Sequence, residues 1–307
     1  MSGFSRLFRV RLRTLLFVVT IFALLVGFVS YKARLQRDAV SALRSRGFGV
    51  AYDYQMPSLW DPQIQATPFG PKWLHALIGD DYFHSVALVT SGRPVTREDM
   101  THIAAFPELQ RLILWDCPTI TGEDLQYFPK LNRLVTLALC NTSFADSGLA
   151  QLPQMDAIQS LTVEGTRITD EGLKHLTHYA SLTGLELDGN NVTGEGLVYL
   201  RNLEQLGFLS LNGCPVTDSG LSQITEIPSI RHLNVGRTEI TDAGMVYISS
   251  LPNLQNLDLN GTDVGDDSVP HLAATKGLLR LKVWDTKLTA TGLATLQAAL
   301  PNCKIEQ

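Results

Sequence analysis

Three acidic residues have the types and spacing that best suit chemistry. Glu164 and Asp188 lie 24 positions apart, and Glu186 precedes Asp188 by two. If a repeating backbone brings them together, their carboxylates would attract Lys or Arg from a partner, or coordinate Ca²⁺, whose ligands are oxygens. The plain alternative is a hydrated surface, because Asp and Glu side chains mostly remain exposed to water.

Other reactive residue types form no recognisable catalytic site in the sequence. His175 and His178 share one helix face at i, i+3, but no third metal ligand accompanies them. The sequence has no phosphate-cradling glycine motif, no nucleophile elbow and no H-E-x-x-H segment. It therefore predicts a protein that is not an enzyme and uses neither a metal nor a cofactor.

A 24-residue repeat positions the acidic residues. Its marker leucines are Leu137, Leu161, Leu185, Leu209, Leu233, Leu257 and Leu281. A period of roughly 20–29 residues with an L-x-x-L-x-L core indicates a leucine-rich-repeat solenoid. We therefore predict an α/β fold, a right-handed horseshoe with a parallel sheet on its concave face and helices on its convex face.

The aliphatic residues of each repeat predict the core. In the repeat that opens at Leu161, the side chains of Ile158, Leu161 and Val163 point inward. Ile168 and Leu173 approach them from the other side. A single repeat cannot bury these side chains alone, so the repeats must stack.

The polar turn residues have structural roles in this register. T-D-x-G segments begin at Thr169, Thr217 and Thr241, and threonine there can cap the following helix. Cys117 and Cys214 occupy the same turn position four repeats apart. That separation is about 19 Å at the usual strand spacing, too far for a disulfide. We expect the four cysteines of the chain to be free thiols.

The concave face is the candidate binding surface, because its solvent-facing strand positions line up in successive repeats about 4.8 Å apart. The first column contains Ile113, Ala138, Thr162, Glu186, Ser210, Asn234, Asp258 and Lys282. The second contains Trp115, Cys140, Glu164, Asp188, Asn212, Gly236, Asn260 and Trp284. The third contains Arg111, Thr136, Ser160, Gly184, Phe208, His232, Asn256 and Arg280. The middle of this face is acidic and rich in amides.

Trp and Arg lie together at both ends of the concave face, and these residue types dominate binding hot spots. A structural alternative is that Trp284, with Arg280 and Lys282, covers the end of the stack. The candidate partner-binding residues are Arg111, Trp115, Glu164, Glu186, Asp188, Asn212, Asn234, Asp258, Arg280, Lys282 and Trp284.

The charge of the chain is distributed unevenly. Residues 1–46 carry nine Lys or Arg and one acid, a net charge of +8, and the remaining residues carry 16 basic and 29 acidic side chains, a net charge of −13. Such an acidic body disfavours nucleic acid, since binding there depends on neutralising phosphates. It favours a solvated domain or basic partners.

Residues 14–31 form an uncharged stretch of 18 residues between Arg13 and Lys32, long enough to cross a membrane as a helix. A cleaved signal peptide is the alternative. The apolar run is longer than a usual signal core, however, and no small-x-small cleavage site follows it. We predict a single-pass membrane protein. Four arginines before the stretch and five basic residues after it leave the orientation without bias.

We divide the chain into a basic arm at 1–13, a transmembrane helix at 14–31, a juxtamembrane helix at 32–47, an N-terminal cap at 48–83, and about nine repeats at 84–307. In the juxtamembrane helix, Leu35, Ala39, Val40 and Leu43 share one stripe, and Gly47 ends the helix. The cap contains a short strand from Val50, a proline-rich loop, and a short helix whose apolar stripe is Trp73, Leu74, Leu77 and Ile78.

Several segments together resemble a large group of leucine-rich-repeat proteins from planctomycete bacteria. These are the basic arm, the anchor, "AVSALRSRGFGVAYDY", "WLHALIGDDYF", the "TDxGL" repeats and the ending "LQAALPNCKI". The resemblance implies a solenoid outside the inner membrane. The repeats are also similar to the class found in ribonuclease inhibitor and in F-box proteins, which recruit substrates to ubiquitin ligases. The anchor occupies the end where an F-box would stand.

These features predict a non-catalytic, membrane-anchored interaction module that binds a protein or peptide on the concave face. One alternative is an envelope scaffold that packs laterally against other copies or other envelope proteins. Another is an intracellular substrate-recognition adaptor of the F-box kind. The sequence predicts no nucleic-acid partner.

Overall fold

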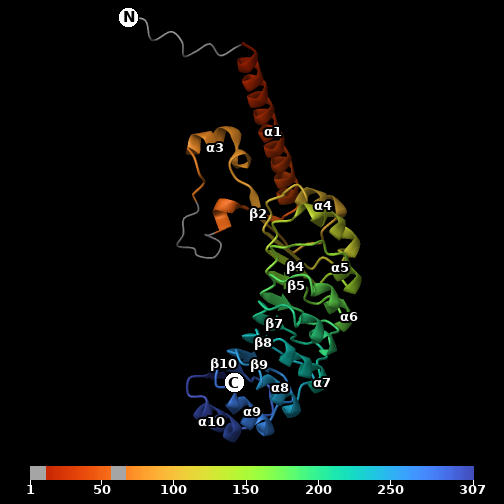
Figure 1. Cartoon of the computed structure of the whole chain (residues 1–307), viewed down its shortest axis with the longest axis vertical. Helices are drawn as coiled ribbons and strands as arrows, with labels where there is room; N and C mark the ends of the chain where they lie inside the picture. The colour runs from red at the N-terminus through yellow and green to blue at the C-terminus, as the bar shows by residue number, and fades with distance from the viewer. Residues whose placement is uncertain (1–11, 57–66) are drawn as a thin grey trace, which may run out of the picture.

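The computed structural model describes residues 12–56 and 67–307. Most of the predicted basic arm and of the proline-rich loop in the cap lies outside these residues. Figure 1 shows one long helix, α1 (Leu12–Ser45), leading into an elongated stack of strands and short helices that ends at the C-terminus.

The strands of the described residues form one sheet, in chain order. They are β1 (Gly49–Tyr52), β2 (Val86–Ser91), β3 (Arg111–Trp115), β4 (Thr136–Cys140), β5 (Ser160–Thr162), β6 (Gly184–Glu186), β7 (Phe208–Ser210), β8 (His232–Asn234), β9 (Asn256–Asp258), β10 (Arg280–Lys282) and β11 (Lys304–Glu306). β1 pairs with β2 antiparallel, and every later pair is parallel.

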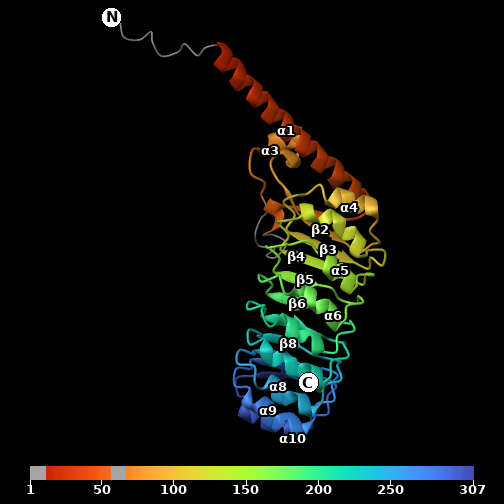
Figure 2. The same ribbon diagram turned by 45° about the vertical axis from the view of Figure 1, so that its right-hand side comes forward.

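Short helical segments lie between the strands. The α-helices after α1 are α3 (Lys72–Ile78), α4 (Arg97–Ile103), α5 (Asp146–Gln151), α6 (Asp170–Leu173), α7 (Asp218–Leu221), α8 (Met245–Ile248), α9 (Val269–Ala274) and α10 (Ala290–Ala299). The 3-10 helices are η1 (Asp53–Gln55), η2 (Asp80–Tyr82), η3 (Gly122–Lys130), η4 (Lys174–Leu176), η5 (Glu195–Leu200), η6 (Ser222–Glu226), η7 (Asp242–Gly244) and η8 (Asp266–Ser268). Figures 1 and 2 show the helices from α4 onward on one side of the stack and the sheet on the other.

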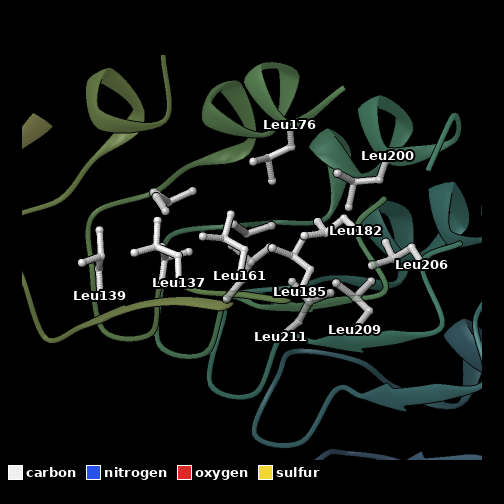
Figure 3. Packing of buried hydrophobic residues seen from close by; sticks show 14 of the residues in the cluster. Leu137, Leu139, Leu161, Leu176, Leu182, Leu185, Leu200, Leu206, Leu209 and Leu211 are labelled. Carbon is white, nitrogen blue, oxygen red and sulfur yellow. The ribbon is translucent and has the colours of Figure 1, made fainter. Parts of the chain in front are cut away.

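The strand register confirms the predicted solenoid. Leu161 pairs with Leu137 on one side and with Leu185 on the other, and the same pairing continues through Leu209 and Leu233. These leucines are fully or almost fully buried. Figure 3 shows Leu137, Leu161, Leu185 and Leu209 pointing into the space between the sheet and the convex helices. Each fully buried aliphatic side chain contributes roughly 1.5–3 kcal/mol, so the stacked columns supply the main stabilising contribution.

The anchor and the juxtamembrane segment form one continuous helix, not the two separate helices expected. The last turns of α1 pack on the start of the solenoid, where Ala39, Val40 and Leu43 are buried. Leu35, which the sequence places on the same stripe, is exposed, and Ala33 is buried in addition to the other three. The helix ends before Gly47, which adopts a left-handed φ of 85°, the conformation that favours glycine at this position.

An aspartate ladder joins successive repeats on the convex side. The backbone N and the Oγ1 of Thr241 both donate to the carboxylate of Asp218, over 2.9 and 2.6 Å. Thr169 donates in the same way to Asp146, 23 residues before it. The threonines also cap their helices, as the sequence predicts: Thr241 Oγ1 accepts from the backbone N of Ala243. The aspartate of each T-D-x-G segment therefore fastens its repeat to the next.

The glycine of T-D-x-G makes room for the ladder. A Cβ added at Gly244 would lie 2.4 Å from Oδ1 of Asp218, and one added at Gly172 would lie 2.2 Å from Oδ1 of Asp146. A side chain at either position would displace the aspartate of the preceding repeat. Each such contact thus joins two successive repeats: the first supplies the aspartate, and the second supplies both the threonine that binds it and the glycine that leaves room for it.

Replacing Asp218 with alanine tests the ladder. The Asp218→Ala variant should lower the free energy of unfolding by about 1.5–3 kcal/mol, because two hydrogen bonds to a charged acceptor are lost. The measurement is the denaturant midpoint of the full chain in detergent micelles. Asp267→Ala is the matched control, since Asp267 also lies in the first turn of a helical segment but is exposed. It should change stability by less than about 0.5 kcal/mol. Equal losses in the two variants would contradict the role of the ladder.

Candidate binding surface on the concave face

The predicted columns are present on the sheet. Glu186 pairs with Thr162 and with Ser210, and Asn234 pairs with Ser210 and with Asp258. Lys282 follows Asp258 in the same column. Carboxylates, amides and hydroxyls therefore alternate along the middle of the concave face at the spacing of neighbouring strands.

Several positions that we expected to face solvent are buried instead. Ala138, Cys140, Thr162 and Ser210 are nearly inaccessible to water. Their side chains are small. Neighbouring strands are only about 4.8 Å apart, so larger side chains on the adjacent strands shield the small ones from water. The described cysteines are all free and buried. Burial raises the pKa of the Cys140 thiol to about 12, so this thiol remains protonated and unreactive at neutral pH.

The acidic residues in the middle of the face come together as expected. Burial is the main cause that raises the pKa of the Glu164, Glu186 and Asp188 carboxyls. The neighbouring carboxylates add to the effect at Glu164 and Glu186. Within the described residues, none of the three carboxylates forms a salt bridge. The middle of the face thus concentrates negative charge that has no cation beside it.

Hydroxyl groups hold two of these carboxylates in place. Thr162 Oγ1 donates to Glu186 Oε1 over 3.3 Å, and Ser210 Oγ donates to Asp188 Oδ1 over 2.5 Å. The backbone N of Asn212 also donates to Asp188 Oδ1, over 3.0 Å. These bonds restrict the two side chains, so that a ligand would meet acceptors already fixed in position.

The amides of the face serve partly to join strands. Asn234 Nδ2 donates to Ser210 Oγ over 3.0 Å, and its Oδ1 accepts from the backbone N of Gly236. Asn260 Oδ1 accepts from the backbone N of Trp284 over 2.8 Å. The candidate residue Asn234 therefore has a structural role in addition to any role in binding.

The two ends of the face lie far from each other. Trp115 on β3 and Trp284 just after β10 are separated by seven strand spacings, or about 34 Å. Both indoles are exposed, at 43% and 56% of their surface. Arg111 lies at the start of β3 and is half-buried. The candidate residues thus form an acidic centre and two distant aromatic ends, which only a large or extended ligand could contact together.

The basic residues at the C-terminal end are already paired. Lys282 Nζ lies 2.9 Å from Asp258 Oδ2, and Arg280 Nε lies 3.6 Å from Glu306 Oε1. The alternative in which Trp284 covers the end of the stack is wrong, because β11 pairs with β10 there and leaves the indole exposed. The C-terminal strand β11 covers the end of the stack instead.

The calcium alternative lacks a ligand set. In residues 12–56 and 67–307, no group of three or more His, Cys, Asp or Glu side chains converges closely enough to hold a metal ion. Glu164, Glu186 and Asp188 are neighbours on a gently curved sheet rather than parts of a loop that could wrap an ion.

A groove of about 940 Å³ that the sequence did not indicate lies outside the concave face, between α1 and the first turns of the solenoid. Val29 and Lys32 line one wall, and His84, Ala105 and Glu108 line the other. These residues stand more than fifty positions apart in the chain. No local motif marks the groove, and only the packing of α1 against the solenoid brings its walls together.

The raised pKa of Glu186 leads to a stability prediction. Folding raises the pKa of the Glu186 carboxyl above its ordinary value of 4.5. Such a group destabilises the folded state increasingly as the pH rises from the unfolded-state pKa through the folded-state pKa. Glu186→Gln keeps an oxygen that accepts from Thr162 and removes the buried charge. It should therefore raise the free energy of unfolding at pH 7 by up to about 1 kcal/mol. The gain should disappear below pH 4.5.

The measurement is the denaturant midpoint of the two chains at pH 7 and at pH 4. Glu204→Gln is the control, because Glu204 is exposed, and it should leave the midpoint unchanged at both pH values. A Glu186→Gln chain less stable than wild type at pH 7 would show that the charged form of Glu186 stabilises the fold.

Comparison with known proteins agrees with this architecture. A family model described as "Leucine Rich repeat" matches residues 180–200 and 227–249. The comparison with curated proteins found no match. Among solved structures, an internalin (inlF) from Listeria monocytogenes is 22% identical with a TM-score of 0.54. The match covers 68% of this chain and 57% of the internalin, so the chain spans little more than half of that protein.

A second solved structure with the same architecture is the TLR13–ssRNA13 complex, which is 18% identical with a TM-score of 0.50. The match covers 70% of this chain and 30% of that one. Likeness at these identities establishes the fold and leaves function to be argued from the site. The chain contains leucine-rich repeats and folds as a leucine-rich-repeat solenoid, preceded by one apolar helix that is a candidate membrane span.

Proposed function

We propose that this chain is a non-catalytic, membrane-anchored interaction module that binds a protein or peptide on its concave face. The observation that carries the proposal is the acidic centre formed by Glu164, Glu186 and Asp188, which no cation neutralises within the described residues. A basic segment of a partner is the ligand that suits it.

The electrostatics of the acidic centre support this choice. Partial burial and mutual repulsion disfavour the charged forms of the three carboxylates in the free protein. A Lys or Arg side chain placed between them would relieve both costs, since opposite charges stabilise one another more strongly where water is displaced. Asp258, in the same column as Glu186 and three strands further along, already has Lys282 at 2.9 Å, which illustrates how the same face accommodates a cation.

The likeness to solved structures leaves the ligand class open. One of those structures contains single-stranded RNA, but the strongly acidic body of this chain argues against a phosphate backbone. A lateral envelope scaffold and an F-box-like adaptor remain the alternatives, and kinship with planctomycete proteins remains a prediction. A scaffold would use the convex side, where Lys174 pairs with Glu171 and Lys287 with Asp263.

Neutralising the acidic centre tests the binding proposal. The triple variant Glu164→Ser, Glu186→Ser, Asp188→Ser should bind a Lys- and Arg-rich peptide library at least tenfold more weakly than wild type, because the charge attraction is lost. The measurement is titration of the full chain in detergent micelles at low and physiological salt. The matched control removes three exposed acids from the convex side: Glu171→Ser, Glu195→Ser and Asp267→Ser.

The two triple variants lose the same net charge, so they differ only in where the charge is removed. If both triple variants lost binding equally, the net charge of the chain alone would explain the effect, and a concave-face site would be rejected. If the convex variant alone disrupts assemblies while the concave variant retains its partners, the scaffold function replaces the one proposed.

We further propose that α1 is retained as a membrane span with the solenoid on the non-cytoplasmic side. The apolar part of α1 has a mean hydropathy of 2.4, and none of it is buried in the protein. A signal sequence has the same composition. The continuity of α1 favours retention, because the helix runs without a break from the apolar stretch into the turns that pack on the solenoid and leaves no extended segment between them for a signal peptidase.

Protease accessibility tests the orientation. With a tag placed after Gln307, protease added to intact spheroplasts should remove the tag, because the solenoid lies outside the inner membrane. A cytoplasmic protein with its own tag serves as the control for lysis and should stay intact. A tag that is protected until the membrane is lysed would place the solenoid in the cytoplasm and favour the adaptor function.

A further inference from the structure

The helix α3 carries the most exposed apolar surface found outside α1 in the described residues. Phe69, Trp73 and Leu77 are exposed at 83%, 67% and 73% of their surface. Trp73 and Leu77 are spaced four residues apart and lie on one face of α3, and Phe69 stands in the turn just before the helix. The sequence places Trp73 and Leu77 on the apolar stripe of this helix. No part of the chain among residues 12–56 and 67–307 covers them, which indicates a site of interaction.

The segment that carries α3 is fastened to α1 just beyond the apolar stretch. Arg37 Nη2 donates to the carbonyl of Ile78, the last residue of α3. Arg37 Nε lies 3.6 Å from Asp81 Oδ2, and Gln36 Nε2 donates to Asp81 Oδ1 over 3.1 Å. Gln36 Nε2 also donates to the carbonyl of His84 over 2.8 Å. This set of bonds fixes where α3 lies along the axis of α1.

That level matches the edge of a bilayer. Arg37 follows Tyr31, the last residue of the apolar stretch, by six residues, or about 9 Å along the helix axis. The polar headgroup layer on each side of a bilayer is about 5–8 Å thick. Figure 1 shows α3 level with part of α1 and further from the strands than the rest of the described cap, in the direction of the free end of α1. If residues 14–31 span the membrane, α3 lies at the boundary between lipid tails and headgroups.

The residue types of α3 suit that boundary. Trp is enriched at membrane interfaces, where its ring is partly apolar and its N–H meets water. Phe and Leu on the apolar face with basic residues on the other side are typical of helices that lie in the interface plane. Lys72 in α3 and Lys32 and Arg34 on α1 are exposed near this level, where they can meet lipid phosphates.

We propose that residues 67–78, the α3 segment, dock on the bilayer beside α1, with Phe69, Trp73 and Leu77 inserted among the lipids at the headgroup boundary. The proposal rests on the membrane span proposed above. It gives the chain two points of attachment to one bilayer, the span and α3. Because α3 is also bonded to α1 and the solenoid packs on the end of α1, the two attachments fix how the solenoid stands relative to the membrane.

Site-specific fluorescent labelling in vesicles tests the proposal. The full chain carrying Leu77→Cys is labelled with an environment-sensitive dye and reconstituted in vesicles of phosphatidylcholine and phosphatidylglycerol. The described native cysteines are all buried, so the introduced thiol labels selectively. Leu24→Cys, within the apolar stretch, reports whether the span is inserted. Val246→Cys, exposed on α8 far from α1, reports a position in water.

The Leu77 label should be quenched several-fold less than the Val246 label by a water-soluble quencher, and strongly by lipids that carry a spin label near the headgroup. If the Leu24 label is in lipid while the Leu77 label responds like Val246, the span stands and the docking of α3 is rejected. If the Leu24 label is also in water, the span itself fails and the docking fails with it. A Leu77 label shielded from both water and lipid quenchers would mean that protein, such as a second copy of the chain, covers α3, and would overturn the proposal.

Discussion

The whole structure depends on one repeat packing closely on the next, because no repeat can bury its own leucines. The T-D-x-G segment makes that close packing specific. The carboxylate of Asp218 accepts two hydrogen bonds from Thr241 in the following repeat, and Gly244 leaves the space that the carboxylate needs. These hydrogen bonds fix the orientation of each repeat relative to the one before it, because a register shift of one residue would break both bonds. The straight columns of the concave face are a consequence of that fixed rotation.

The array also shows what happens where the ladder is interrupted. Gly194 stands where other repeats have the aspartate, and the backbone N of Thr217 donates instead to the carbonyl of Thr193 over 3.2 Å. A Cβ at Gly194 would lie within 3.0 Å of the backbone of Gly220, so the two repeats approach more closely there. The missing carboxylate is replaced by direct backbone contact, and the sheet continues without a break through β6 and β7. Close stacking of the repeats is therefore what the fold requires. The aspartate usually joins neighbouring repeats, but direct backbone contact can replace it.

The sequence revealed what depends on periodicity and missed what depends on packing between distant segments. The parallel sheet, the pairing of Leu161 with Leu185 and the capping threonines follow from a 24-residue period, because equivalent residues occupy equivalent positions in each repeat. The burial of Cys140 and Thr162 could not be read in this way, since it depends on the sizes of neighbours in adjacent repeats. The exposure of Trp73 was missed for a different reason. Helical periodicity identifies an apolar face but does not say whether protein or lipid will cover it.

The charge of the chain separates a basic N-terminal segment from an acidic solenoid. The net charge of +8 lies in residues 1–46 and that of −13 in the remainder. The acidic centre lies on and beside β5 and β6, three to four strand spacings from β2, or about 14–19 Å. Exposed charges more than about 8 Å apart are largely screened at physiological salt, so the basic residues near the bilayer do not neutralise Glu164 or Asp188. In the membrane-anchored arrangement proposed above, anionic lipids would attract the basic segment, while the acidic centre would lie beyond the reach of their screened field. A partner's basic segment would then meet the carboxylates of Glu164, Glu186 and Asp188 away from the headgroups that compete for it.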